Sequence, residues 1–455
     1  MKPNIFFLSL DSFTANKCFG KNKSSKTPNI DSLIENGVLF NQTISSSDGT
    51  ELSFASIFTS KYSSQIGLNG KIVTKIPSTI PNIFTLLKEN GYHVYGTLPE
   101  PSPLMDEIIK NFENSDFEYR ANFQLYDGLG QQILEKFKMN KLSEPWIYFI
   151  HLLDLHLSIS LPSEFDKDEF GDNKYDRMVS ALDVWFGKIL EKIKLDNTLV
   201  VLTSDHGEYI PSINYNGKII SNFYSDAAAK VLWNIETNLP SQLLPIRNRL
   251  FSVGRKMLKR KKAKEFSGLD IPPNKKRALL NNRNDPNGYL FDELVHVPLI
   301  FSGIGLKSKI ITNMVRHVDI FPTIIELIGF QPLKVNIEGR SLTPLLDNKP
   351  LEELPVFMEC RNRITEESRS VIGLRTSKWK YFRGKDKTRK RVFLFDLEND
   401  PLEEKNIKEQ NPEIIKKMEK ILEDFNKESL PEVGEKLTDE ETKKIEKELR
   451  KLGYI

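Results

Sequence analysis

The feature that most constrains the fold is a repeated alternation of short apolar segments with helical segments. Residues 4–11, 146–154, 197–205 and 296–303 read NIFFLSLD, WIYFIHLLD, NTLVVLTSD and HVPLIFSG. Each has the length of a strand and is apolar almost throughout, which is typical of strands buried on both faces of a parallel sheet. One intervening helix is expected to begin with Thr27 at the N-cap and Pro28 at the first helical position, and to stop at Gly37. The pattern predicts an α/β fold with a mostly parallel central sheet flanked by helices.

The length and the changes of pattern along the chain indicate more than one unit. A chain of 455 residues is too long for one ordinary core. We expect residues 1–350 to form the main domain, interrupted by a basic insertion over residues 208–290 where the strand pattern is lost. Residues 351–430 are predicted to form a small α+β subdomain, because two strand-like segments precede the amphipathic segment PEIIKKMEKILEDFNKE. Residues 431–455 are predicted to be a charged, helical tail.

Composition indicates which partners and which cellular compartment to expect. The net charge of +3 is near balance and indicates no partner by itself. Cys18 and Cys360 are far apart, so they form neither a disulfide framework nor a metal motif, and a reducing compartment is favoured. No run of about 18 apolar residues occurs, and residues 4–10 are too short for the core of a signal peptide. We therefore expect a cytoplasmic protein, either free or peripheral at a membrane.

Acidic residues follow several of the apolar segments. Asp11, Asp154 and Asp205 each come at the end of one, and ligands of open α/β sheets bind beyond the carboxyl ends of the strands. Asp205 and His206 together suit a divalent metal, and Asp11 supplies a third candidate ligand. Each of these residues also has a simpler interpretation, as a helix cap, a turn or a solvated loop residue.

Thr50 lies at the start of a segment with helical apolar spacing. Gly49 before it permits an unusual backbone angle, and the segment from Glu51 to Tyr62 reads ELSFASIFTSKY. A helix N-terminus favours an anion, and a hydroxyl held on a metal is an activated nucleophile. The simpler interpretation is that Thr50 is an N-cap.

The insertion contains a strongly basic stretch. Nine Lys or Arg lie between Arg247 and Lys264, with apolar residues on one helical face. Three hypotheses are open: a solvated lid helix or pocket wall, a site for an anionic polymer, and a helix at a membrane surface.

In order along the chain, these segments resemble the sulfatase-like family of the alkaline phosphatase superfamily. NIFFLSLDS resembles the first strand with its metal-binding Asp, and TPNIDSLIENGVLFNQTIS resembles the helix and strand before the nucleophile. SFASIFTSKYSSQIG resembles the segment after the nucleophile, FIHLLDLH resembles the motif H-x-x-D-P-H, and TSDHGE resembles the second metal motif. HVPLIFSG, HVDIFPTIIELIG, EGRSLTPLL, LRTSKWKYF and LFDLENDPLEEKNI follow in family order. The resemblance covers nearly the whole chain and implies a sulfatase-like α/β fold with a small C-terminal subdomain.

Three departures from the family pattern bear on the chemistry. Sulfatases carry C-x-P-S-R, or Ser for Cys, and oxidise its first residue to formylglycine. Thr50, followed by ELSF, stands at that position and cannot be converted. Relatives that transfer phosphoryl groups use a Thr directly, so the resemblance implies that Thr50 is the nucleophile. Ser12 replaces the usual second Asp, as in branches that bind the metal through one Asp there. GTLPEP replaces the segment G-K-W-H, so a substrate-binding Lys is lost or replaced.

The resemblance also implies roles for the other candidates. One divalent ion (calcium, magnesium, manganese or zinc) is expected on Asp11, Thr50, Asp205 and His206. His156 matches the last His of H-x-x-D-P-H and would bind the anion or protonate the leaving group, although it could also be a structural His near a turn. Contacts to the ligands or to substrate are assigned to Ser12, Asp154, His296 and His317. His151 is interpreted as packed within a strand, and His93 as structural.

The expected activity is metal-dependent cleavage of a sulfate or phosphate ester by a hydrolase or a transferase, through a covalent Thr50 intermediate. The substrate is an anionic ester, with carbohydrate and lipid-linked compounds as alternatives, and the partner of residues 247–264 is a membrane surface or an anionic polymer. No nucleic acid is expected, and the oligomeric state is open. The alternatives are a two-metal phosphodiesterase or phosphotransferase, with a second ion on Asp154, His156 and His317, and a degenerate family member that binds an anionic glycan without catalysis.

Overall fold

The computed structural model describes residues 2–21, 23–68, 76–100, 105–121, 123–138, 141–156, 159–210, 212–221, 257–281, 288–331, 336–360, 371–385 and 391–427. The tail predicted over residues 431–455 lies outside these ranges, as does the part of the basic segment before residue 257.

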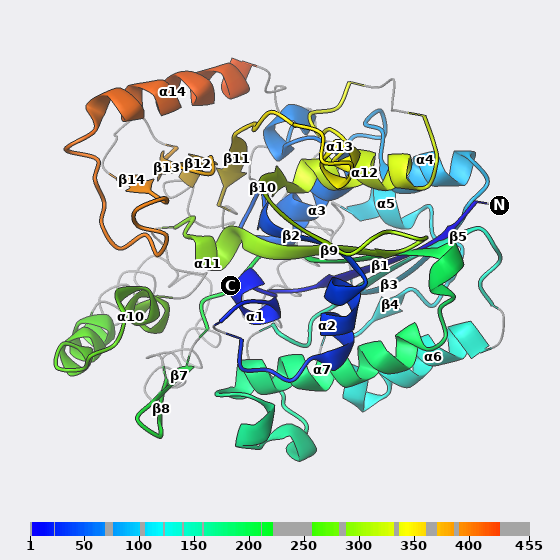
Figure 1. The fold of residues 1–455 in the computed structure, drawn as a ribbon, viewed down its shortest axis with the longest axis horizontal. Helices are drawn as coiled ribbons and strands as arrows, with labels where there is room; N and C mark the ends of the chain where they lie inside the picture. Colours follow the sequence, from blue (N-terminus) through cyan, green and yellow to red (C-terminus); the bar gives the residue numbers. More distant parts are fainter. Residues whose placement is uncertain are drawn as a thin grey trace, which may run out of the picture.

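A mixed, mostly parallel sheet forms the centre of the molecule (Figure 1). Its eight strands are β1 (Asn4–Leu10), β2 (Gly37–Ile44), β3 (His93–Pro99), β4 (Glu118–Tyr119), β5 (Trp146–Leu152), β6 (Thr198–Ser204), β9 (His296–Gly303) and β10 (Lys309–Arg316). The strand order is β10-β2-β9-β6-β1-β5-β3-β4. Only β9 within this sheet runs against its neighbours, β2 and β6. The mostly parallel sheet predicted from the apolar segments is confirmed, because those segments occupy central positions that are buried on both faces.

Helices cover both faces of this sheet. One face carries α3 (Thr50–Thr59), α4 (Ile83–Glu89), α5 (Asp106–Ile109), α12 (Ile320–Leu327) and α13 (Thr343–Leu346). The other face carries α1 (Ala15–Cys18), α2 (Pro28–Glu35), α6 (Leu129–Lys138) and α7 (Lys174–Leu190). Thr27 is the N-cap of α2 and Pro28 its first residue, as predicted.

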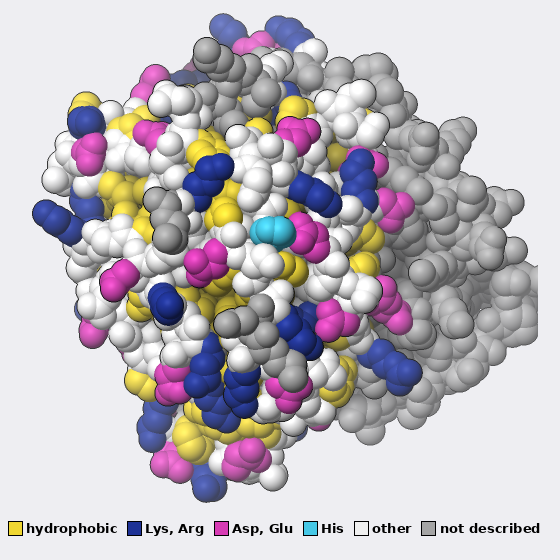
Figure 2. Space-filling view, turned by 90° about the vertical axis from the view of Figure 1, so that its right-hand side faces the viewer, with side chains coloured by type: hydrophobic (Ala, Val, Ile, Leu, Met, Phe, Trp, Pro, Cys, Tyr) yellow, Lys and Arg dark blue, Asp and Glu magenta, His cyan; other side chains and the backbone are white. Residues whose placement is uncertain are grey.

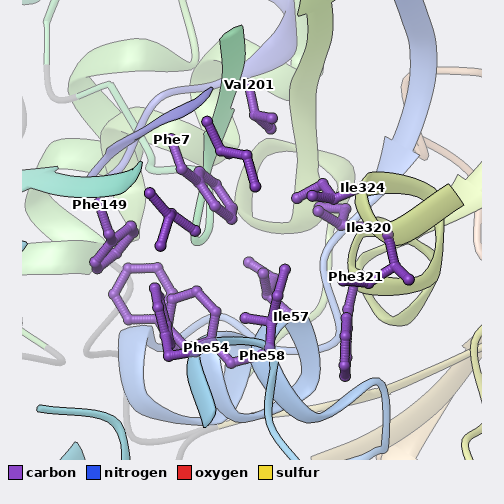
Figure 3. Packing of buried hydrophobic residues seen from close by; sticks show 14 of the residues in the cluster. Phe7, Phe54, Ile57, Phe58, Phe149, Val201, Ile320, Phe321 and Ile324 are labelled. Carbon is purple, nitrogen blue, oxygen red and sulfur yellow. The ribbon is translucent and has the colours of Figure 1, made fainter. Parts of the chain in front are cut away.

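The core on the α3 face is rich in aromatic side chains. Phe7, Phe149 and Val201 project from β1, β5 and β6 towards Phe54 and Phe58 of α3 (Figure 3). The rings of Phe58 and Phe149 meet edge-on with centroids 5.1 Å apart. Full burial of each such side chain contributes roughly 1.5–3 kcal/mol, so α3 is held firmly against the sheet.

A second, antiparallel sheet follows in the C-terminal part of the chain. It contains β11 (Val356–Glu359), β12 (Val371–Arg375), β13 (Trp379–Gly384) and β14 (Val392–Asp396). The amphipathic helix α14 (Pro412–Lys427) packs Met418 and Leu422 against one face of this sheet. The predicted α+β character of this region is confirmed, whereas the boundaries at residues 350 and 430 stay predictions.

The described part of the predicted insertion contains a hairpin and two helices. β7 (Ser212–Tyr215) and β8 (Lys218–Ser221) pair antiparallel, residues 257–266 are helical, and α10 (Pro273–Leu280) follows. Their shared small core is formed by Phe266, Ile271 and Leu279. The remaining short helix, α11 (Asp292–Val295), leads from the insertion into β9.

The surface carries charges of both signs. On the face shown in Figure 2, Lys and Arg side chains are interspersed with Asp and Glu, with one tighter basic group near the lower edge. Among the described residues of this face, charges of one sign do not form a broad surface. Within the described residues, none of the helices combines the length and the apolar character needed to cross a membrane.

Candidate active site

Three strand ends bring their polar side chains to the same face of the central sheet. In the parallel ladders Ser9 lies beside both His151 and Thr203. Side chains alternate along a strand, so Asp11 and Asp205, two residues further on, are placed on the same face as His151. The ligand atoms of Asp11, His151 and Asp205 all lie within 4.8 Å of one another, and the three side chains are buried. The predicted convergence of acidic strand ends therefore occurs for Asp11 and Asp205.

The turn after β1 orients both carboxylates. Ser12 adopts a left-handed backbone conformation with φ 62°, which is uncommon for a non-glycine residue. Such strained residues are often found at functional sites, and this one directly follows the candidate ligand Asp11. Its hydroxyl donates to Asp11 Oδ1 at 2.6 Å, and its backbone N–H donates to Asp205 Oδ1 at 3.3 Å. The Oδ2 atoms of Asp11 and Asp205 are the oxygens that approach His206 Nε2, at 4.0 and 3.4 Å. Ser12 thus contacts both candidate ligands.

His206 presents a lone pair to the two carboxylates. Its Nδ1 lies 2.8 Å from the carbonyl oxygen of Gly207, which can only accept, so Nδ1 carries a proton, and in the neutral ring Nε2 keeps its lone pair. Gly207 is needed for close approach, since a Cβ there would lie 2.2 Å from the carbonyl oxygen of Glu293. The Gly207 N–H also donates to the Leu294 carbonyl of α11 at 2.8 Å. The backbone of α11 therefore supports the segment that holds Asp205 and His206.

Thr50 is the first residue of α3 and faces the same cluster. Its Oγ1 lies 3.4 Å from Asp11 Oδ2 and 3.4 Å from His206 Nε2. Gly49 occupies the N-cap with φ −139° and ψ 142°, an ordinary extended conformation, so the expected unusual backbone angle is absent. Thr50 is therefore not an N-cap, and the simpler interpretation of this residue is wrong. Thr50 is half-buried.

Comparison with known families fits this arrangement. The model of the family described as Sulfatase matches residues 3–330, which is more than half of the chain. The chain belongs to the sulfatase family. A second model, described as "N-sulphoglucosamine sulphohydrolase, C-terminal", matches residues 286–428, which include the antiparallel sheet.

Among curated members of the sulfatase family, arylsulfatase K of Rattus norvegicus is 33% identical over 140 residues, covering 29% of this chain and 25% of the relative. Arylsulfatase K of Gallus gallus is 34% identical over 140 residues, covering 29% and 26%. These matches span about a quarter of the length of the curated relatives.

Solved structures share the fold over nearly the whole chain. The phosphonate monoester hydrolase of Agrobacterium radiobacter has a TM-score of 0.61 at 15% identity, covering 94% of this chain and 96% of that chain. A protein solved in complex with its substrate, D-glucosamine-2-N,6-O-disulfate, has a TM-score of 0.63 at 15% identity, covering 94% and 98%. At these identities the likeness confirms the predicted sulfatase-like fold and carries nothing further.

His151 is the residue that sequence reasoning missed. It is buried as expected, but Nε2 lies 3.9 Å from Asp11 Oδ2, inside the cluster. Burial lowers the pKa of His151 to about 4, His156 adds to the lowering, and Asp11 and the nearby Ser9 carbonyl oppose it. The imidazole is therefore neutral near pH 7 and retains a lone pair. His151 enters the cluster through the register of β5 against β1, which places it beside Ser9, and the sequence carries no signal for that register.

The other predicted residues lie around the cluster with different partners. Asp154 accepts the Leu125 N–H at 3.1 Å, and burial raises the pKa of its carboxyl to about 7. His296 Nε2 lies 2.8 Å from the Asn41 carbonyl, to which it donates. His317 is fully buried near the Ser204 carbonyl, and burial lowers its pKa to about 3. His156 is half-buried and close enough to His151 to affect its titration.

The donor set fits a divalent cation. Carboxylate oxygens cannot donate hydrogen bonds, and Asp205 Oδ2 lies 3.4 Å from His206 Nε2, which carries a lone pair when the ring is neutral. Lone pairs that face each other across this distance repel, and a cation between them would convert the repulsion into attraction. Asp11, Thr50, Asp205 and His206 could thus hold one ion. Among the described residues, the second-ion trio of Asp154, His156 and His317 does not form a cluster of this kind.

Proposed function

We propose that the chain is a metal-dependent enzyme that cleaves sulfate or phosphate esters, with Thr50 as the nucleophile. The observation that carries the proposal is the position of Thr50 Oγ1, 3.4 Å from both Asp11 Oδ2 and His206 Nε2 at the first turn of α3. Membership of the sulfatase family and the fold shared with a phosphonate monoester hydrolase support the reaction class.

Asp11, Asp205 and His206 would hold the ion, which supplies positive charge to stabilise the alkoxide and the charge that grows on the transferred group. The residues around it have separate tasks. Ser12 and the Gly207 carbonyl fix the orientation of the ligands. Asp11 Oδ2, which lies as near the Thr50 hydroxyl as His206 Nε2 does, would accept the hydroxyl proton when Thr50 attacks. The first N–H groups of α3 favour the anionic group that approaches Thr50.

The chemical step is an in-line displacement. A bond forms between Thr50 Oγ and the sulfur or phosphorus atom as the bond to the ester oxygen breaks, and the departing alcohol takes a proton, which His156 would supply. The second step restores Thr50 when the oxygen of water, or of an acceptor alcohol, displaces Oγ and gives up its own proton. A Thr adduct cannot collapse as a formylglycine hydrate does. This difference favours phosphoryl chemistry and makes a transferase as plausible as a hydrolase.

A panel of candidate substrates tests which class of ester the protein cleaves. Purified protein is assayed with an aryl sulfate, a phosphate monoester, a phosphodiester and a phosphonate monoester, each with calcium, magnesium, manganese or zinc. Because a structural neighbour is described with a sulfated glucosamine as its substrate, sulfated and phosphorylated sugars belong in the panel. Metal analysis should give about one ion per chain. Two ions would favour the two-metal alternative, and none the non-catalytic glycan-binding alternative.

Substitution of Thr50 tests the nucleophile. Thr50→Ala should lower turnover by orders of magnitude, since it removes the whole covalent path, and Thr50→Ser should retain part of the rate. Stability should change little, because Thr50 is not the N-cap, and the remaining ligands should still bind the ion, although less tightly without the Thr50 hydroxyl.

Ser56→Ala is the matched control. Its hydroxyl is buried on the same helix and donates to the Leu52 carbonyl at 3.1 Å, away from the cluster. A quenched reaction analysed by mass spectrometry should carry the sulfate or phosphate on the peptide that contains Thr50. Unchanged turnover in Thr50→Ala, or an adduct on Ser53 or Ser56, would refute the assignment.

A further inference from the structure

His151 lies where a metal ligand would lie, although the sequence pattern suggests a packed strand residue. Its Nε2 is 3.9 Å from Asp11 Oδ2, and its ligand atom lies within 4.8 Å of those of both Asp11 and Asp205. Two atoms bound to one ion, each at about 2.1 Å from it, are no more than about 4.2 Å apart. The distance between His151 Nε2 and Asp11 Oδ2 is therefore short enough for both atoms to bind the same ion.

The hydrogen bonding of His151 points the same way. The side chain is 2% exposed, and neither ring nitrogen makes a hydrogen bond of normal geometry, although the backbone of Ser9 lies near enough for a poorly aligned one. Buried polar atoms almost always have a partner, and leaving one without costs about 1–3 kcal/mol. A purely structural His would leave this cost unexplained, whereas an ion shared with Asp11 and Asp205 would satisfy the ring.

Packing fixes the ring in this orientation. The Phe54 ring meets the imidazole edge-on with centroids 4.8 Å apart. Phe54 lies four residues after Thr50 on α3, so the two side chains share one face of the helix. The same helix face therefore places Thr50 in the cluster and holds His151 against it.

The two carboxylates can contribute few oxygens. Ser12 occupies Oδ1 of Asp11 and Oδ1 of Asp205, so only one oxygen of each faces the centre. With the Thr50 hydroxyl this gives three oxygens and, with His206 and His151, two imidazole nitrogens. Calcium prefers six to eight oxygens, and magnesium prefers oxygen and water, whereas imidazole nitrogens suit the first-row transition ions and zinc.

We infer that His151 is a metal ligand and that the site selects a transition ion such as manganese, cobalt or zinc over calcium and magnesium. This inference rests on the proposed function and narrows its cofactor. The cluster then contains two imidazole ligands instead of one: His151 from β5 and His206, which follows the end of β6.

Metal titration by calorimetry tests the assignment without an activity assay. Wild-type protein should bind Mn²⁺ more tightly than Ca²⁺. His151→Leu, which removes the nitrogens and keeps an apolar side chain, should weaken Mn²⁺ binding by at least about 10-fold, the smallest loss typical for groups that support a metal, and should affect Ca²⁺ less. His93→Leu on the neighbouring strand β3 is the control, because His93 is partly exposed and pairs with Glu113 at 2.9 Å. It should leave both affinities unchanged.

Pulsed EPR of Mn²⁺ bound to wild-type protein provides a measurement that does not depend on the variant folding. Two imidazole nitrogens should couple to the ion. Coupling to a single imidazole, or equal Mn²⁺ affinity in folded His151→Leu, overturns the inference and leaves the proposed function standing. Failure of wild-type protein to bind any divalent ion overturns both.

Discussion

At the scale of single residues, burial separates the acidic side chains into two kinds. Asp11 and Asp205 face a cluster of ligand atoms, whereas Asp154 is buried with one backbone N–H donor at Oδ1. For Asp154, burial outweighs that hydrogen bond and raises the pKa of the carboxyl to about 7. Its geometry therefore indicates a structural residue that holds Leu125, not a ligand.

A pH-dependent measurement checks this assignment. Between the ordinary carboxyl pKa and about 7, the folded state binds more protons at Asp154 than the unfolded state, so its contribution to stability falls as pH rises through this window. Asp154→Asn keeps an acceptor for the Leu125 N–H and does not titrate. Relative to wild type, the variant should gain stability from pH 5 to pH 8, by no more than roughly 3 kcal/mol.

Urea unfolding at the two pH values measures the difference, and the comparison with wild type cancels the other titrating groups. Metal affinity should be the same in Asp154→Asn and wild type. A loss of metal affinity would place Asp154 in the site and revive the second-ion hypothesis.

At the scale of elements, the strands were predictable and their alignment was not. The segments at residues 4–11, 146–154 and 197–205 become β1, β5 and β6 because continuous apolar runs can be buried on both faces. Register depends on contacts between distant segments, and it is register that brings His151 beside Ser9 and into the cluster. For the same reason the antiparallel direction of β9 could not be read from HVPLIFSG.

A local signal was available in the insertion. Asn216 and Gly217 adopt positive φ angles of 51° and 78° between β7 and β8. An Asn-Gly pair between strands is a strong indication of a hairpin, and this signal was overlooked when residues 208–290 were interpreted as lacking a strand pattern. The boundary at residue 208 stays a prediction. The helices of the insertion depend on a small shared core and gave no comparable signal.

The first turn of α7 supports the ligand turn after β1. The hydroxyl of Tyr175 donates to the Ser12 carbonyl at 2.7 Å and accepts the Thr14 N–H at 3.2 Å. Tyr175→Phe would leave two buried backbone groups without this partner, at a cost of about 1–3 kcal/mol each at most. Because Ser12 holds both carboxylates, we also expect weaker metal binding, by about 10-fold, measured by calorimetry.

Tyr126→Phe is the control for Tyr175→Phe. In the wild type, the Tyr126 hydroxyl donates to the Ala181 carbonyl of α7 at 3.0 Å, and Tyr126 lies far along the chain from the turn after β1. The control should lose a little stability and no metal affinity. Equal metal affinity in both variants would show that α7 does not orient the ligands.

At the scale of the whole molecule, the antiparallel sheet is connected to the candidate site by buried charges. Lys380 of β13 is fully buried, with Nζ 2.6 Å from Asp292 Oδ1 and 2.9 Å from Glu403 Oε1. Arg375 and Lys380 hold the pKa of Asp292 well below its usual range, despite its burial. Asp292 begins α11, whose Leu294 carbonyl accepts the Gly207 N–H. The second sheet thus supports the segment that carries Asp205 and His206.

This connection predicts that one buried cation stabilises both sheets. Lys380→Met should cost about 3–5 kcal/mol of stability, because it leaves two buried carboxylates without their shared partner. Metal affinity should fall with it, since α11 loses its anchor. Lys378→Met is the matched control: Lys378 pairs with Glu398 at 2.7 Å on the surface, and its loss should leave the melting temperature unchanged within error. If the C-terminal sheet were an independent unit, Lys380→Met would instead lower a separate C-terminal transition and leave metal binding intact, which calorimetric unfolding and titration of the same samples would reveal.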